Sequence, residues 1–197
     1  MPSVPGELQR IFRGSDSRPA PVPGVVHLNG EFTRAEFLNL GNVRAEDKRV
    51  VHIASHFDAA KGAERSSKLL LGTGGSIDLR EIDAWPGLFR DVELLTLSAC
   101  RTAYTNHGED GREIDSFGIV AQRQGAKAVI ASLWSVDDAS TGYLMEAMYR
   151  IRQEQPSLGK SEALRRSQEQ LASGAAGHRE WTHPYYWAPF ILIGNWR

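Results

Sequence analysis

Short, strongly apolar segments alternate along the chain with segments whose apolar residues recur at helical spacing. The three longest apolar segments are 49–55 (RVVHIAS), 92–100 (VELLTLSAC) and 126–134 (AKAVIASLW), and each is typical of a buried strand. KLLLGTGGSIDL (68–79) predicts two short strands around a glycine-rich turn. We also expect a strand and a turn in VVHLNGEF (25–32) and a closing strand in YYWAPFILIGNW (185–196).

Helices are predicted between these strands. Thr33, with Glu36 three residues later, predicts the start of a helix that ends near Gly41. Asp115 is the expected cap of a helix that ends at Gly125. Further helices are expected in 5–14, from Asp137 and Asp138 onward, and in 157–173. The alternation predicts an α/β fold, with a mostly parallel sheet covered by helices on both faces.

Composition narrows the class of protein. A length of 197 residues suits one domain, and a net charge of −1 gives no bulk attraction to nucleic acid or to an anionic membrane. The single cysteine excludes an intramolecular disulfide. No apolar run approaches the roughly 20 residues of a membrane-spanning helix, and the first residues lack the pattern of a secretory signal. We therefore expect a cytoplasmic protein that binds neither membranes nor nucleic acid directly.

Three chemically useful residues follow or end the predicted buried strands: His56, Cys100 and Asp137. Ligands of open α/β sheets bind outside the carboxyl ends of the strands, so these residues are candidates for one site. An imidazole beside a thiol can accept its proton and later protonate a leaving amine. The competing interpretation is that Cys100 is a small buried hydrophobic residue and that the histidines, His52 included, are structural.

Four blocks carry a resemblance to a known family: VVHIASHF (50–57), LLTLSACRT (94–102), GAKAVIASLWSVDDAST (125–141) and HPYYWAPFILIG (183–194). In this order they resemble the CHAT family of caspase-like proteases. The resemblance implies a three-layer sandwich of the caspase-haemoglobinase type, with a His–Cys dyad formed by His56 and Cys100. We expect a single domain over 1–197, with an amino-terminal helix, loop and strand in 1–46 and a catalytic core in 47–197.

The sequence departs from the family pattern directly after the dyad histidine. The family usually has glycine there, and this chain has Phe57. The resemblance implies an oxyanion hole formed by the backbone N–H groups of Phe57 and Cys100. Glycine adopts backbone angles that phenylalanine reaches only at a cost, so the departure puts the geometry of the hole in doubt. A phenylalanine here is also a candidate substrate contact, or a plug over the cleft.

The resemblance also suggests where substrate binds. It places the block LWSVDD, with Trp134, Asp137 and Asp138, at the primary specificity pocket, where an acidic residue favours cleavage after Arg or Lys. Glu109 and Asp110 form a weaker acidic pair. The alternative is that Asp137 and Asp138 are plain helix-capping carboxylates.

From the His–Cys pair and the family resemblance we expect a cysteine endopeptidase that cuts protein or peptide substrates. The resemblance implies control by an amino-terminal sensor or repeat domain or by a separate activator. Bacterial signalling or defence is the expected setting. The rival class is a protein-interaction module with an inactive dyad.

A hydrolase or transferase of another kind lacks support, because no Gly-x-Ser-x-Gly or nucleotide-binding motif occurs. Neither a metal nor a cofactor is expected, since the histidines and the cysteine lack ligand spacing. The oligomeric state stays open.

Overall fold

The structure is a computed structural model that describes residues 4–14, 18–43, 49–58, 66–101 and 112–197. For residues 99–101 and 112–116 the description covers the backbone. The predicted acidic pair, Glu109 and Asp110, lies outside the described residues. The chain divides into two compact units, one formed by His27–Ser135 and the other by Met1–Val26 with Val136–Arg197.

The His27–Ser135 unit contains a mixed sheet in which the strands follow the order β3-β2-β1-β4-β5. The strands are β1 (Val50–Asp58), β2 (Lys68–Leu70), β3 (Ser76–Asp78), β4 (Leu94–Arg101) and β5 (Ala128–Ser132). β1, β4 and β5 are parallel, whereas β2 pairs antiparallel with β1 and with β3. The predicted buried strands and the glycine-turn hairpin are therefore confirmed.

Strand β1 has one apolar face and one polar face. Val51, Ile53 and Phe57 are buried in the main hydrophobic core, which also contains Leu95 and Leu97 of β4. Successive residues of a strand point to opposite faces, so the intervening residues belong to the other side of the sheet. On β1 and β4 these residues are Val50, His52, Ala54, His56, Asp58, Leu94, Thr96, Ser98 and Cys100. The polar residues of this side of the sheet therefore lie at and near both predicted dyad positions.

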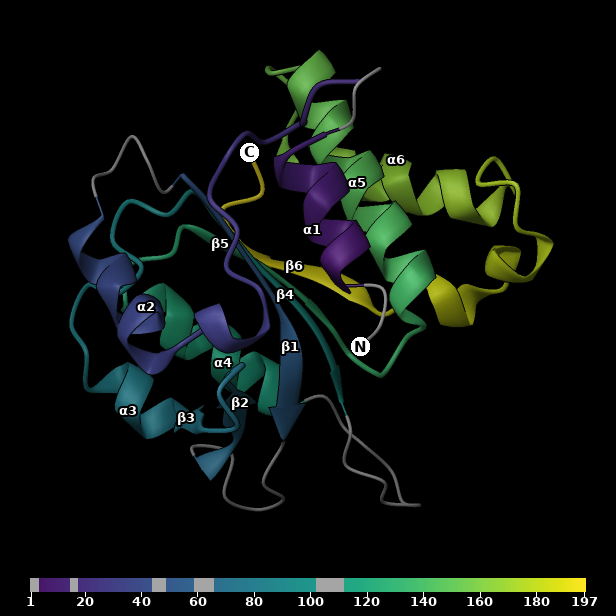
Figure 1. Cartoon of the computed structure of the whole chain (residues 1–197). Coiled ribbons are helices and arrows are strands. Elements are labelled where there is room, and N and C mark those ends of the chain that lie inside the picture. Colours follow the sequence, from purple (N-terminus) through teal and green to yellow (C-terminus); the bar gives the residue numbers. More distant parts are fainter. Residues whose placement is uncertain (1–3, 15–17, 44–48, 59–65, 102–111) are drawn as a thin grey trace. The chain divides into compact units, whose positions relative to one another are not determined.

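Three helices pack on the apolar face of this sheet: α2 (Arg34–Asn39), α3 (Leu79–Asp83) and α4 (Arg112–Arg123) (Figure 1). The Thr33 hydroxyl caps α2 by accepting from Glu36 N at 3.1 Å, as predicted. Gly125 has a φ of +109°, which suits its predicted role just beyond α4. The predicted start of α4 is wrong, because Asp115 lies inside the helix and cannot cap it.

Helix α3 was not predicted, although the sequence carries its signal. Asp78 and Glu81 form a capping box in which the Asp78 side chain accepts from Glu81 N and the Glu81 side chain accepts from Asp78 N. Leu79 and Ile82 then bury their side chains fully in the core. The short length of α3, five residues, hides the helical periodicity that a longer segment shows.

The second unit contains helices α1 (Val4–Phe12), α5 (Asp138–Glu154) and α6 (Lys160–Ala172) and strand β6 (Phe190–Gly194). Short 3-10 turns, η5 (Arg179–Thr182) and η6 (Pro184–Tyr186), precede β6. α5 packs against both α1 and α6. Glu146 of α5 pairs with Arg10 of α1 at 2.9 Å and with Arg150 at 3.3 Å, so a carboxylate shared by two guanidinium groups joins α1 to α5.

The predicted α/β class, with a mostly parallel sheet flanked by helices, is confirmed. The predicted strand at 25–32 is wrong. Residues 29–31 form a 3-10 turn, η1 (Asn29–Glu31), and a second turn, η2 (Leu40–Asn42), follows α2. Asn29 has a φ of +49°, which breaks an extended chain, and Val25 is 80% exposed, so burial does not favour a strand there. None of the helices among the described residues is long and apolar enough to cross a membrane.

Candidate active site

His56 and Cys100 occupy the same register position on neighbouring parallel strands. The β1–β4 ladder pairs His56 with Cys100, and the next pair is Phe57 with Arg101, the last residue of β4. Parallel strands lie about 4.8 Å apart, and register partners share one face of the pleat. The structure therefore brings the two predicted dyad residues together, at the carboxyl ends of β1 and β4.

The side chain of His56 is half-buried. Its Nδ1 atom is buried and has no hydrogen-bond partner among the residues that the structure describes. His52, on the same face of β1, pairs in register with Thr96, four residues before Cys100. Of the two histidines on this strand, His56 is therefore the one placed for chemistry with the thiol.

Phe57 is a core residue. Its side chain is 4% exposed and meets the ring of Phe117 of α4 edge-on, with centroids 5.8 Å apart. The idea that this ring covers a cleft is wrong, because Phe57 lies on the apolar face of β1 and its ring is packed in the core. Phe57 is also absent from the residues with positive φ, so the glycine-to-phenylalanine change imposes no left-handed backbone here.

The backbone of Phe57 lies in a ladder on both sides. It pairs with Leu69 of β2 and with Arg101 of β4. Backbone N–H groups of a strand lie in the plane of the sheet, so the N–H of Phe57 points toward a neighbouring strand. The predicted oxyanion role of this N–H stays a prediction.

Ser98 precedes Cys100 by two residues and lies on the same face of β4. It is 2% exposed, and its Oγ has no hydrogen-bond partner among the described residues. A buried hydroxyl without a partner is uncommon, because its desolvation is not compensated. The face of the sheet that carries the predicted dyad thus holds two such atoms, Ser98 Oγ and His56 Nδ1.

The three predicted substrate-binding residues fall in different units. Trp134 is half-buried and lies two residues beyond β5, in the unit that contains His56 and Cys100. Asp137 and Asp138 belong to the other unit. Asp137 is the N-cap of α5, and its Oδ1 accepts from Ala139 N and Ser140 N at 3.0 Å each. Asp137 therefore has a structural task, and its role in specificity stays a prediction.

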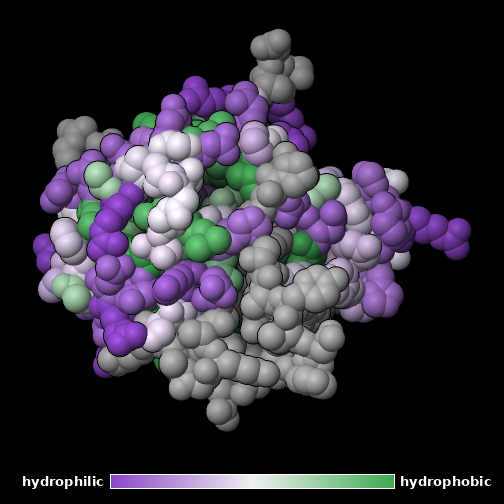
Figure 2. Space-filling view, turned by 60° about the horizontal axis from the view of Figure 1, so that its bottom comes forward, coloured by the Kyte–Doolittle hydropathy of each residue, from purple (hydrophilic) through white to green (hydrophobic). Residues whose placement is uncertain are grey.

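The carboxyl end of β1 lies at the bottom of Figure 1, and Figure 2 brings that side forward. The described residues seen there are mainly hydrophilic, with smaller hydrophobic areas between them (Figure 2). Within the described part of the chain, no three His, Cys, Asp or Glu side chains group as metal ligands would.

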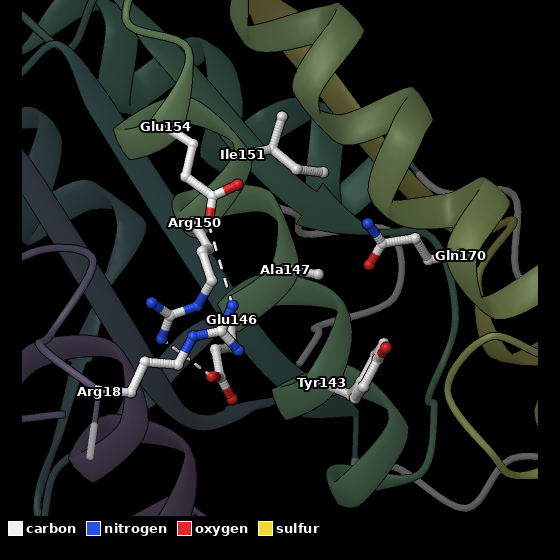
Figure 3. A pocket seen from close by; sticks show the side chains of 8 residues that line it. All are labelled: Arg18, Tyr143, Glu146, Ala147, Arg150, Ile151, Glu154 and Gln170. Carbon is white, nitrogen blue, oxygen red and sulfur yellow. Dashed lines mark hydrogen bonds and ion pairs between the residues drawn. The ribbon is translucent and has the colours of Figure 1, made fainter. Parts of the chain in front are cut away.

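A pocket of about 270 Å³ lies in the unit that contains α5 (Figure 3). Its charged walls are Arg18, Glu146, Arg150 and Glu154. These groups pair with one another, Glu146 with Arg150 at 3.3 Å and Glu154 with Arg18 at 3.9 Å. The positive and negative side chains that line the pocket therefore neutralise one another. None of the predicted site residues lines it.

Ser55, beside the predicted dyad, was not identified from the sequence. Ser55 Oγ donates a hydrogen bond to the carbonyl oxygen of Leu70 in β2 at 2.7 Å. Its signal in the sequence is a polar residue in the apolar row of β1, between Ile53 and Phe57.

Comparison with known protein families gives a match over nearly the whole chain. The family model of the CHAT domain matches residues 1–195. A search of curated proteins finds no match to the chain. The CHAT domain defines a caspase-like family, and the match covers nearly all of the 197 residues. This chain therefore belongs to the CHAT-domain family.

Proposed function

We propose that this protein is a cysteine endopeptidase in which Cys100 is the nucleophile and His56 the general base and acid. The observation that carries the proposal is the pairing of His56 with Cys100 at the ends of two parallel strands. This is the position at which open α/β sheets bind ligands. Membership of a caspase-like family supports the same chemistry.

The reaction needs two proton transfers to the same imidazole. His56 takes the thiol proton, and the Cys100 thiolate attacks the carbonyl carbon of the scissile peptide bond. When the tetrahedral intermediate collapses, the C–N bond breaks and His56 protonates the leaving amine. Water then attacks the thioester while His56 accepts its proton. The acid product leaves, and the thiol is restored.

The oxyanion of the intermediate needs N–H donors. We propose the N–H groups of Cys100 and Phe57 for this task, as in the family pattern. Phe57 is paired with Leu69 and with Arg101, so in this proposal its N–H faces the substrate where the ladder opens locally at one of these partners. A partner or substrate that opens this ladder would activate the enzyme. This activator, as a sensor or repeat domain or as a separate protein, is part of the proposal.

The same observation favours a second candidate function. If the ladder at Phe57 stays closed, the oxyanion lacks one donor. The chain then acts as a protein-interaction module of the CHAT family with a weak or inactive dyad. The two functions differ in whether Cys100 reacts with a peptide carbonyl analogue.

The test is labelling of the native chain with peptide electrophiles that carry different residues before the reactive group, read by mass spectrometry. Cys100 is the only cysteine, so each adduct is assigned without ambiguity. We expect His56→Ala to abolish labelling and His52→Ala to retain it. His52→Ala is the matched control, since His52 lies on the same strand and face.

Cleavage of a peptide library by the wild type and by Cys100→Ala completes the test. Cuts that vanish with the cysteine support the endopeptidase, and cuts after Arg or Lys support an acidic specificity pocket. Labelling that is equal in the wild type and in His56→Ala would contradict the dyad and favour the interaction module.

A further inference from the structure

We propose that Ser55 is a positioning residue of the dyad. Its hydroxyl ties β1 to β2 at Leu70 and thereby holds His56 in place opposite Cys100. This inference rests on the proposed function, because positioning matters for chemistry only if His56 and Cys100 react together.

The hydrogen bond of Ser55 continues the link between β1 and β2 beyond their ladder. The ladder pairs Asp58 with Lys68 and Phe57 with Leu69. The next residue of β2 is Leu70, and its carbonyl oxygen accepts from Ser55 Oγ at 2.7 Å. A side chain thus provides a tie between the two strands immediately before His56.

Ser55 lies on the face of β1 whose other side chains pack in the apolar core. The core-facing positions of β1 are Val51, Ile53, Ser55 and Phe57, and the other three are buried in the apolar core. A hydroxyl in such a row costs desolvation unless it is hydrogen-bonded. Ser55 is half-buried, and its bond to Leu70 compensates the desolvation of the hydroxyl.

A tie can position β1 only if its other end is fixed. The side chain of Leu69 is fully buried, and Leu70 pairs with Ser76 of β3. The hairpin end is held in turn by Gly72, whose N–H donates to the carbonyl oxygen of Phe32 at 3.0 Å. A Cβ at Gly72 would lie 1.5 Å from the carbonyl oxygen of Asn29, so backbone packs directly on backbone there.

The backbone of His56 is consequently held on both sides. Ser55 anchors it to β2, and Phe57 anchors it to α4 through Phe117. The Nδ1 atom of His56 has no hydrogen-bond partner among the described residues, so in this proposal the position of the ring depends on the backbone that carries it. A displacement of about 1 Å at a reacting group can lower a rate about 100-fold.

The sharpest test compares Ser55→Thr with Ser55→Val. The two side chains have nearly the same shape and both suit a strand, but only threonine keeps the hydroxyl. The readout is the rate at which iodoacetamide alkylates Cys100, measured against pH. This readout needs no substrate, and the lone cysteine makes it specific. Circular dichroism and thermal melting confirm that each variant is folded.

We expect Ser55→Thr to alkylate within about threefold of the wild type. Ser55→Val should react about tenfold more slowly below pH 8, with its profile displaced toward the ordinary thiol pKa of about 8.5. Ser167→Ala is the control for stability. It removes a hydroxyl-to-carbonyl bond of the same 2.7 Å length, from Ser167 to Leu164 in α6. It should lower the melting temperature without changing the pH profile.

The possible outcomes separate the two proposals. If His56→Ala slows alkylation while Ser55→Val and Ser55→Thr react equally, the positioning role is wrong and the dyad stands. If the wild type reacts no faster than the denatured chain and is unaffected by His56→Ala, the proposed function fails, and this inference fails with it. If Ser55→Val does not fold, Ser55→Ala replaces it in the same comparison.

Discussion

The ring of Phe57 stands nearly perpendicular to the ring of Phe117, at 79° with 5.8 Å between centroids. This edge-to-face contact is favourable beyond the burial of the two rings. It joins β1, next to His56, to helix α4. Phe57, at the position where the resemblance implies glycine, therefore stabilises the sheet at the candidate site.

The first prediction concerns this contact. Phe57→Ala should lower the free energy of unfolding by about 3–5 kcal/mol, because it leaves a cavity in the core. Phe57→Gly, which restores the usual family residue, should cost at least as much. Urea denaturation measures both. Val25→Ala, at a side chain that is 80% exposed, is the control and should change stability by less than about 0.5 kcal/mol. A loss below about 1 kcal/mol for Phe57→Ala would contradict the core assignment.

The second prediction concerns the buried hydroxyl of Ser98. Ser98→Ala should leave the free energy of unfolding unchanged or raise it by up to about 1 kcal/mol, because the hydroxyl has no partner among the described residues. Ser167→Ala, which breaks a satisfied hydrogen bond, should lower it by about 1 kcal/mol. Chemical denaturation of the two variants gives the comparison. A clear destabilisation by Ser98→Ala would reveal a partner for this oxygen.

The third prediction separates the two roles of Asp137. Asp137→Ala should destabilise the protein by about 1 kcal/mol, since α5 loses its N-cap, whereas Asp137→Asn keeps a capping oxygen and should cost little. If the charge also selects basic substrates, Asp137→Asn alone should abolish a preference for Arg or Lys. Thermal melting and library cleavage measure the two effects. An unchanged preference in Asp137→Asn would remove this residue from the specificity pocket.

The fourth prediction concerns Glu162 on the surface of α6. Hydrogen bonds from Arg165 first, and then from Arg166, lower the pKa of Glu162 from its ordinary 4.5 to about 2. A lowered folded-state pKa contributes stability that is complete above pH 4.5 and is lost as the pH falls toward 2. Carbon-detected NMR should show this midpoint, and Arg165→Ala should raise it. A midpoint near 4.5 in the wild type would contradict the ion-pair geometry.

Buried, regular elements could be predicted from the sequence, because burial leaves a pattern in the residues themselves. β1, β4 and β5 are examples. Because His56 and Cys100 lie at the carboxyl ends of β1 and β4, their proximity could be predicted as well. Asp115 was predicted as a cap that the structure places inside α4, because a helix start depends on backbone geometry that one residue type does not determine. The hydrogen bond of Ser55 joins residues 15 positions apart, and no local periodicity reports such a contact.

The alternation along β1 also protects the alignment of the candidate dyad. A slip of one residue between β1 and β4 would turn each side chain of β1 to the opposite face. His52 and His56 would then enter the apolar layer, while Val51, Ile53 and Phe57 would leave it. The free energy gained by burying these apolar side chains therefore also opposes any misalignment of His56 with Cys100. The packing of the core and the alignment of His56 with Cys100 therefore depend on the same strand register.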